Sequence, residues 1–229
     1  MTQPAHSPTS GIPGTPFSSR QCAVLAGSGV ARVWERGEEL LRHGGPPDCA
    51  ILIGEGLVKI TAYADTGYEG LLALRGPGEL VGELSCIDDK PRSATATAMR
   101  TVHGTVITAA AFRRLLARDG ELSFAILRSV VGRLRDSDGM RLDQGAHPAG
   151  ARIARVLLDL ALRHGADVSD APDARTVSVN QQELAGAAGT SRESVVRTLR
   201  VLQQDGLVST SRGRTRINDM WRLGRWAGI

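Results

Sequence analysis

The sequence contains 229 residues, of which 41% are hydrophobic and 23% charged, and its formal net charge is +4 at pH 7. This length allows two modest cores, and the composition excludes a fibrous or a wholly disordered protein. No stretch approaches the roughly 20 apolar residues of a membrane span, and the N-terminus lacks the basic start and apolar run of a signal peptide. We therefore expect a cytoplasmic protein with no membrane partner.

Cysteine and histidine usage argues against a metalloenzyme. Cys22, Cys49 and Cys86 form no C-x-x-C pair, and the histidines form no cluster with carboxylates. A nucleophile–base motif is also missing, which disfavours a hydrolytic enzyme. We predict no metal ligand, no catalytic residue, no enzymatic activity and no cofactor.

The first part of the chain reads as a tail, a short helix and a set of strands. Residues 1–19 are rich in Pro, Ser, Thr and Gly, a composition typical of a disordered tail. A short helix follows from Ser19 to Gly27. Glycines then separate evenly spaced β-type runs, which predict an antiparallel sandwich or roll. The expected strands are 31–34, 39–42, 50–53, 57–63, 70–74, 80–81, 94–98 and 102–108.

The pattern then becomes helical, with helices expected at 109–118, 121–144 and 149–164. The second of these has an apolar stripe that either packs against the roll or forms a parallel dimer seam, and its length favours the seam. The stripe consists of Leu122, Ile126, Leu127, Val130, Val131, Leu134 and Met140.

Two connecting segments complete this region. The break at 145–148 ends in Pro148 and predicts a hinge between domains. Residues 165–174 read as an acidic loop, either solvated surface or a contact with a partner such as RNA polymerase.

The C-terminal region has the pattern of a winged helix-turn-helix. Residues 181–197 give a helix, a glycine turn and a second helix capped by Ser191, and 209–217 read as a two-stranded wing with Gly213 at its tip. Residues 176–229 also carry eight arginines against four acids, whereas the rest of the chain is balanced. Arg192, Glu193 and Arg197 lie on one side of the second helix, and their side chains suit guanine and cytosine edges in a major groove.

A second motif lies at residues 82–95. A cyclic phosphate needs a fixed cation and hydrogen-bond donors, and a ribose hydroxyl needs an acceptor carboxylate. Arg92 and Glu83 supply these groups. The alternative is a structural salt bridge between them in a roll that binds nothing, and we weigh ligand binding above it.

Both motifs resemble those of the CRP/FNR family of transcription regulators, over about residues 30–217. The resemblance implies an α+β fold: an N-terminal cyclic-nucleotide-binding β-roll of jelly-roll type, a long dimerisation helix and a C-terminal winged helix-turn-helix. It implies that Ser191, Arg192, Glu193 and Arg197 bind double-stranded DNA, with TGTGA-like half-sites. The three cysteines cannot supply the four cluster ligands of the oxygen-sensing FNR branch.

The resemblance also implies which residues bind the cyclic nucleotide. Glu83 would hold the ribose hydroxyl, Arg92 and Ser93 the phosphate, and the amides of Gly82 to Leu84 would assist. A gap-free register along the long helix implies that Ser137 and Asp138 face the base, where Ser137 fits the family pattern and Asp138 departs from it.

The expected organisation is a tail at 1–19, a nucleotide-binding domain at 20–120, a dimerisation helix and hinge at 121–148, and a DNA-binding domain at 149–229. The expected function is a homodimeric, allosteric regulator controlled by a cyclic nucleotide, with cAMP as the first choice of effector. Ligand binding would repack the seam and rotate the DNA-binding domains at the hinge. The alternatives are a ligand-independent regulator of this fold, one that senses another nucleotide such as cyclic di-GMP, and a regulatory module that binds no DNA, which the helix-turn-helix disfavours.

Overall fold

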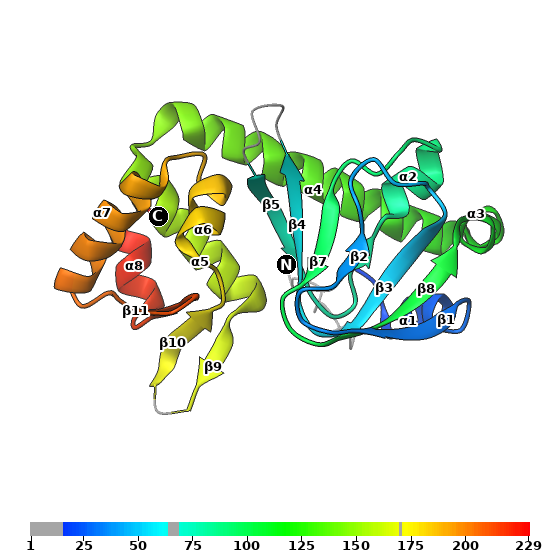
Figure 1. The fold of residues 1–229 in the computed structure, drawn as a ribbon, viewed down its shortest axis with the longest axis horizontal. Coiled ribbons are helices and arrows are strands. Elements are labelled where there is room, and N and C mark those ends of the chain that lie inside the picture. The colour runs from blue at the N-terminus through cyan, green and yellow to red at the C-terminus, as the bar shows by residue number, and fades with distance from the viewer. Residues whose placement is uncertain (1–15, 64–68, 170) are drawn as a thin grey trace, which may run out of the picture. The chain divides into compact units, whose positions relative to one another are not determined.

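The computed structural model describes residues 16–63, 69–169 and 171–229. It has the predicted fold class, with antiparallel sheets, one long helix and a winged helix-turn-helix (Figure 1). The described residues form two compact units: residues 16–58 with 75–132, and residues 59–63 and 69–74 with 133–169 and 171–229. Within the described residues, none of the helices combines the length and apolar character that a bilayer crossing needs.

The predicted N-terminal strands and helices appear in the predicted order, with most strand boundaries within one or two residues of the expected positions. The structure adds a short helix at 83–88 that the sequence analysis did not predict. The N-terminal elements are α1 (Ser19–Ala26), β1 (Val30–Trp34), β2 (Glu39–Leu41), β3 (Cys49–Glu55), β4 (Val58–Tyr63), β5 (Glu69–Arg75), β6 (Leu80–Val81), α2 (Glu83–Asp88), β7 (Thr95–Ala98), β8 (Val102–Thr108), α3 (Ala109–Arg118) and α4 (Gly120–Ala146).

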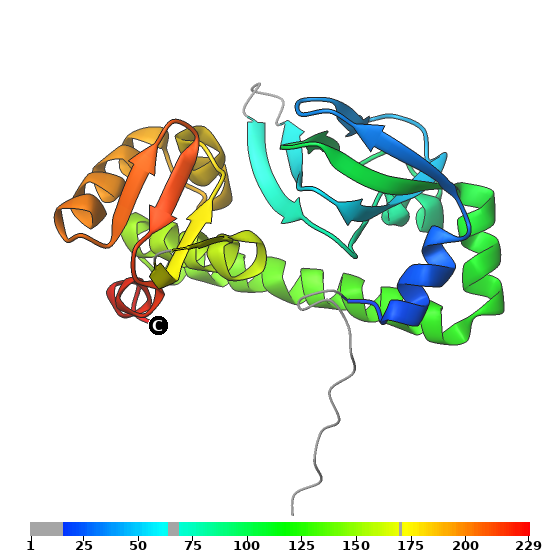
Figure 2. The same ribbon diagram turned by 90° about the horizontal axis from the view of Figure 1, so that it is seen from below.

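The strands form two antiparallel sheets, ordered β1-β8-β3-β6 and β2-β7-β4-β5. In the first sheet Ile51 of β3 pairs with Val106 of β8, which in turn pairs with Val30 of β1. The roll core includes buried residues from β3, β8, α1, α2 and α3, and the first turns of α4 complete it (Figure 2). This packing fixes β3 and α2, the elements that carry the first candidate site.

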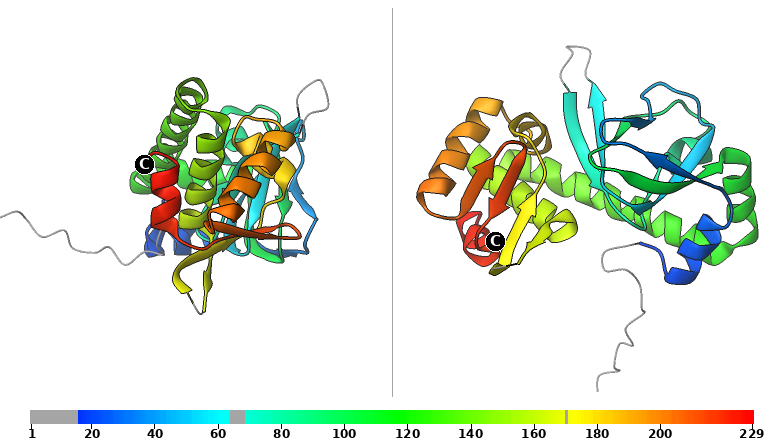
Figure 3. Two further views of the ribbon diagram at one scale, coloured as in Figure 1. Left: turned by 90° about the vertical axis from the view of Figure 1, so that its left-hand side faces the viewer. Right: turned by 60° about the horizontal axis from the view of Figure 1, so that its bottom comes forward.

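The C-terminal elements are α5 (Ala149–His164), β9 (Ala166–Val168), β10 (Ala171–Val177), α6 (Gln181–Ala187), α7 (Arg192–Gln204), β11 (Val208–Ser211), β12 (Arg214–Ile217) and α8 (Met220–Trp226). The four strands form one antiparallel sheet, ordered β11-β12-β10-β9, and α5, α6 and α7 contact one another beside it (Figure 3). Ile153, Leu157, Leu184, Val195 and Leu202 are fully buried and form the centre of this core.

The structure corrects the loop expected at 165–174. Residues 166–168 and 171–177 form the antiparallel strands β9 and β10, with Thr176 paired with Ala166. The strands were not predicted because the acidic residues of this segment interrupt the alternation of hydrophobic and polar residues on which a strand prediction depends. The wing is consequently part of a four-stranded sheet, where the sequence predicted two strands.

Two helical features also differ from expectation. The apolar stripe of α4 is divided: Leu122 and Ile126 are buried in the roll core, whereas Leu127, Leu134 and Met140 are 43–58% exposed. Packing against the roll therefore accounts for the first part of the stripe. The chain also ends in α8, a helix that the sequence analysis did not predict.

The predicted tail ends earlier than residue 19. Phe17 is buried in the roll core, and Ser18 caps α1 in a capping box with Gln21. The rest of the predicted tail, residues 1–15, lies outside the described residues.

Candidate effector pocket and DNA-binding face

The first candidate site starts at a glycine turn between β6 and α2. Gly82 has φ +80°, a conformation that favours glycine. A Cβ at this position would also lie 2.6 Å from Leu41 Cδ1 and 2.7 Å from Arg92 Nη1. Only glycine therefore allows the backbone to approach the Arg92 side chain this closely.

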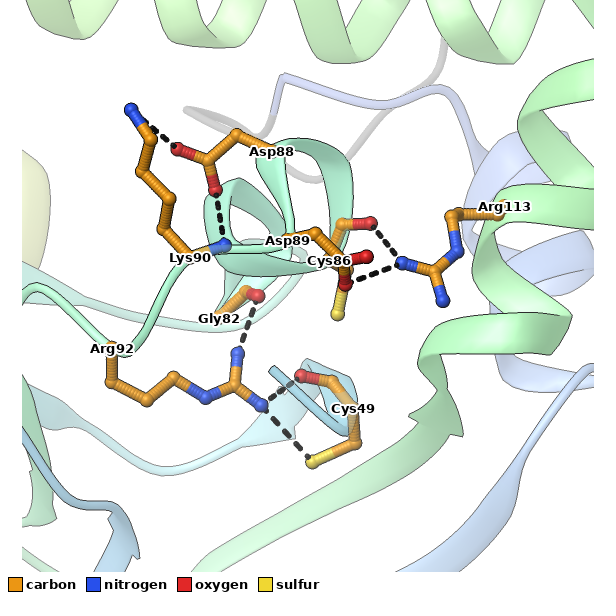
Figure 4. Close-up of polar contacts among 8 residues, drawn as sticks. All are labelled: Cys49, Gly82, Cys86, Asp88, Asp89, Lys90, Arg92 and Arg113. Atoms are coloured by element: carbon orange, nitrogen blue, oxygen red, sulfur yellow. Dashed lines mark hydrogen bonds and ion pairs between the residues drawn. The ribbon is translucent and has the colours of Figure 1, made fainter. Parts of the chain in front are cut away.

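Arg92 is the centre of this site. It is 4% exposed, and its Nη1 donates to the Gly82 carbonyl at 2.7 Å. Its Nη2 donates to the Cys49 carbonyl at 2.6 Å and to Asp48 Oδ1 at 2.9 Å (Figure 4 shows the Gly82 and Cys49 contacts). A buried guanidinium needs such partners, because desolvation of an unpaired charge is costly. The side chain thus joins the start of α2 to the start of β3.

Asp48 and two thiols complete the surroundings of Arg92. Partial burial alone would raise the pKa of Asp48, but hydrogen bonds from Cys49 and Arg92 and the charge of Arg92 outweigh it and hold that pKa below its ordinary value. Burial raises the pKa of the Cys49 thiol to about 11 and also raises that of Cys86. Both thiols are therefore protonated near neutral pH, which suits packing and not nucleophilic chemistry.

A second arginine holds the other end of α2. Arg113 Nη1, on α3, donates to the Cys86 carbonyl at 3.1 Å and to Asp89 Oδ1 at 3.1 Å (Figure 4). Asp89 itself adopts φ +59° as the C-cap of α2. The short helix is consequently fixed at both ends by arginines from other parts of the domain.

The other predicted pocket residues differ in exposure. Glu83 is 2% exposed, whereas Leu84 is 44% exposed and Ser93 is exposed. Ser137 and Asp138 are exposed on α4, in the second compact unit, and Asp138 pairs with Arg141 at 3.5 Å. The structure brings Gly82 and Arg92 together; a base contact by Ser137 and Asp138 stays a prediction.

The second candidate site begins with two capped helices. Asn180 and Glu183 form a capping box at the start of α6, and the Ser191 hydroxyl accepts from the Ser194 amide at the start of α7. Between the helices, Gly189 turns the chain with φ +57°. These local hydrogen bonds fix where α7 begins, as the sequence predicted.

The predicted DNA-reading residues lie together on the outside of α7. Arg192, Glu193 and Arg197 are all exposed and line one surface hollow of about 310 Å³. Arg197 Nη2 donates to Ser194 Oγ at 3.0 Å, one turn back on the same helix. Hydrogen bonds from its own amide and from Ser191 hold the pKa of Glu193 below its ordinary value, so the carboxylate remains an acceptor at neutral pH.

A larger groove of about 630 Å³ adjoins this face. It lies between the start of α6, α7 and the wing, and its lining includes Gln181, Arg192, Arg212 and Arg214. Three arginines beside the amide side chains of residues 180–182 make a surface suited to phosphate and base edges. Together with α7, this groove forms the candidate DNA-binding face of the second unit.

Comparison with known proteins identifies the two domains that carry the candidate sites. Residues 31–119 match a family model described as "Cyclic nucleotide-binding domain", and residues 151–226 match "Crp-like helix-turn-helix domain". The chain is therefore a transcription regulator with a nucleotide-binding domain and a DNA-binding domain.

The relatives show the family. The chain is 33% identical to the CRP-like cAMP-activated global transcriptional regulator of Mycobacterium tuberculosis, over 84% of this chain and 85% of that protein. It is 31% identical to the cyclic AMP receptor protein of Thermus thermophilus, over 82% and 83%. The chain belongs to the CRP family of transcription regulators.

A solved structure supports the same assignment. The c-di-GMP responsive global regulator CLP of Xanthomonas campestris superposes with a TM-score of 0.75 at 25% identity, covering 88% of this chain and 99% of that chain. The fold is therefore shared with a regulator that responds to a different effector from the one named for the sequence relatives.

Sequence reasoning missed the partners of the candidate functional side chains. Asp48 and Cys49 contact Arg92 from 44 and 43 residues away, and neither stands in a recognisable motif. Arg113 lies in a helix that the sequence predicted correctly, but nothing in that helix pattern pairs it with α2. The groove beside the wing did have a signal in the sequence, because the arginines of the C-terminal region stand out in the charge distribution.

Proposed function

We propose that this protein is a sequence-specific transcription regulator that binds DNA as a homodimer under the control of cAMP. The observation that carries the proposal is the presence, in one chain, of a buried arginine at a glycine turn and an exposed Arg192, Glu193 and Arg197 set on a capped helix. The first suits a phosphate inside a protein, and the second suits bases in a groove.

The DNA target that fits this helix is a pseudo-palindrome with TGTGA-like half-sites about one helical turn apart. Two arginines match guanines, and the Glu193 carboxylate matches a cytosine amino group. Ser191 adds a hydroxyl at the end of the helix that enters the groove. The wing arginines supply phosphate contacts that hold the register.

The homodimer is supported by the exposed apolar side chains of α4. Phe124, Leu127, Leu134 and Leu142 are 55–73% exposed, and such a set on a single helix marks an interaction surface. A twofold dimer along α4 presents two DNA-binding faces to the two halves of the operator. RNA polymerase is a further partner that we propose, because the relatives are transcriptional regulators.

The effector is supported by Arg92, Glu83 and Ser93 and by relatives whose names state activation by cAMP. Cyclic di-GMP is the second candidate, because the structural neighbour from Xanthomonas responds to it and because Asp138 departs from the family pattern. We propose no enzymatic activity and a cytoplasmic site of action, where operator DNA lies.

The test is a calorimetric titration of the full chain with cAMP, cGMP and cyclic di-GMP, with and without an operator duplex. We expect cAMP to bind and the operator to tighten that binding, since coupling between two sites is reciprocal. Arg92→Ala is expected to weaken cAMP binding by about 100-fold or more, because two charge-assisted hydrogen bonds contribute about 3 kcal/mol or more.

Arg100→Ala is the matched control. Arg100 lies in the same domain and donates to the Gly56 carbonyl at 3.2 Å, away from α2, so its replacement should leave cAMP affinity unchanged. Thermal melting must show that Arg92→Ala remains folded, because Arg92 also holds Gly82 and Cys49. Equal cAMP affinity in Arg92→Ala and Arg100→Ala would show that the pocket is wrongly placed. Operator binding without any nucleotide would identify a ligand-independent regulator.

A further inference from the structure

A single arginine of α5 holds carbonyls from two separate segments of the second unit. Arg152 Nε donates to the Ala188 carbonyl at 3.0 Å, and Nη2 donates to the Gly189 carbonyl at 3.0 Å. Its Nη1 donates to the His147 carbonyl at 2.9 Å. Three of the five N–H groups of this planar side chain are thus directed at backbone acceptors.

The three acceptor carbonyls lie at the turn of the helix-turn-helix and at the end of α4. Ala188 is the C-cap of α6, and Gly189 is the turn of the helix-turn-helix, with φ +57°. His147 directly follows the last residue of α4. A cation is favourable at the C-terminal end of a helix, where carbonyls lack intrahelical partners. Arg152 therefore joins the end of α6 to the end of α4.

The turn is also packed closely against α4. A Cβ at Gly189 would lie 2.6 Å from Gln144 Nε2, so this side chain occupies the space beside the turn. Ser191, the N-cap of α7, follows only two residues later, and Arg192 is the first residue of the helix. A shift of the turn therefore moves the base-reading face directly.

We propose that Arg152 is a positioning residue for DNA reading: by binding the turn and the hinge residue His147 together, it sets the angle at which α7 meets the groove. The proposal rests on the proposed function, since it concerns how the chain reads DNA. Arg152 itself contacts carbonyls and not DNA.

The test compares Arg152→Met with Arg155→Met in the full chain. Arg155 lies three residues later on α5 and donates to the Ala227 and Gly228 carbonyls at 3.2 Å each, at the end of α8. Arg155 Nη1 also pairs with Asp143 Oδ1 of α4 at 3.5 Å. Both changes therefore remove one charge, hydrogen bonds to carbonyls and a contact with the end of α4, but only the first releases the helix-turn-helix turn.

The readout is the ratio of affinities for a selected operator and a scrambled duplex, measured over a range of salt concentrations. We expect Arg152→Met to lower this ratio about 10-fold and Arg155→Met to leave it within about 2-fold. The slope of log affinity against log salt should stay unchanged in both, because only removal of a phosphate-binding side chain would lower it by about one unit.

Arg152→Lys is the second variant. It keeps the charge, but a single ammonium cannot reproduce the planar fork that reaches both segments, so the ratio should fall as in Arg152→Met. This variant also decides the question if Arg152→Met does not fold.

Three outcomes would overturn the inference: an unchanged ratio in Arg152→Met, a salt slope lowered by one unit, or full recovery in Arg152→Lys. A wild-type protein that does not discriminate between the two duplexes would instead refute the proposed function. That result is visible before any variant is made.

Discussion

Arg92 in the roll is 4% exposed and held by the Gly82 carbonyl and by two groups more than 40 residues away in sequence, whereas Arg197 on α7 is exposed and held by Ser194 within its own helix. The first arginine depends on the folded domain for its position, and the second depends on a capped helix. Changes around Arg92 should therefore cost stability and ligand binding together. Changes around Arg197 should alter DNA binding alone.

Gly82→Ala is expected to have the largest effect. The new Cβ would meet Leu41 and Arg92 at under 3 Å in a backbone with φ +80°, so the decrease in stability should be about 2–4 kcal/mol from strain and overpacking together. Chemical denaturation followed by circular dichroism measures it. Gly37→Ala is the control: φ is +91° but no atom lies within 4 Å, and the expected cost is about 1 kcal/mol. Equal decreases would mean that the approach to Arg92 is not tight.

Substitution on α7 should change base preference without changing stability. Glu193→Ala and Arg197→Ala should each relax preference at one base pair, because each removes a side chain whose hydrogen bonds to a base are worth about 1–3 kcal/mol of discrimination. Selection from random duplexes measures this, with Arg200→Ala, also exposed on α7, as the control. Identical preferences in all these proteins would show that α7 positions the protein without reading sequence.

The wing should contribute affinity but little sequence preference. Arg214 lines the groove beside α7, and its replacement by Ala should weaken binding to all sequences about equally and lower the salt slope by about one unit. Filter binding at several salt concentrations measures both effects. A wild-type affinity that does not change with salt would exclude the arginine-rich C-terminal region as the DNA surface.

The smallest expected effect is a pH dependence in the roll. Because the pKa of Asp48 is lower in the folded protein than its ordinary value of 3.8, its contribution to stability is present above that value and disappears as the pH falls through the folded pKa. Wild type should therefore lose more stability than Asp48→Asn when the pH is lowered from 5 to about 3. Denaturation at each pH measures this difference. If the stability of both proteins changes equally with pH, the Asp48–Arg92 pair contributes nothing to stability, as is common for ion pairs with an exposed partner.

The sequence predicted the features that depend on nearby residues and missed those that depend on distant ones. Helices α3 and α5 begin and end at the residues that their apolar spacing and flanking residues indicate. The start of α7 at Ser191 and the turn at Gly82 were likewise readable, because caps and positive φ angles depend on nearby residues. Strands β9 and β10 were missed, since they carry charge and are ordered by pairing with each other and, for β10, with β12.

The sequence by itself determined the two motifs, with their candidate phosphate- and base-binding residues, and the order of the elements apart from α2, β9, β10 and α8. The tertiary structure decided what holds those residues in place. Asp48 and Cys49 reach Arg92 across the roll, and Arg152 reaches carbonyls 36 and 37 residues further along the chain. Local patterns cannot specify such pairs, because a buried guanidinium accepts any correctly placed oxygen as its partner, and only the packed fold determines which oxygens are within reach.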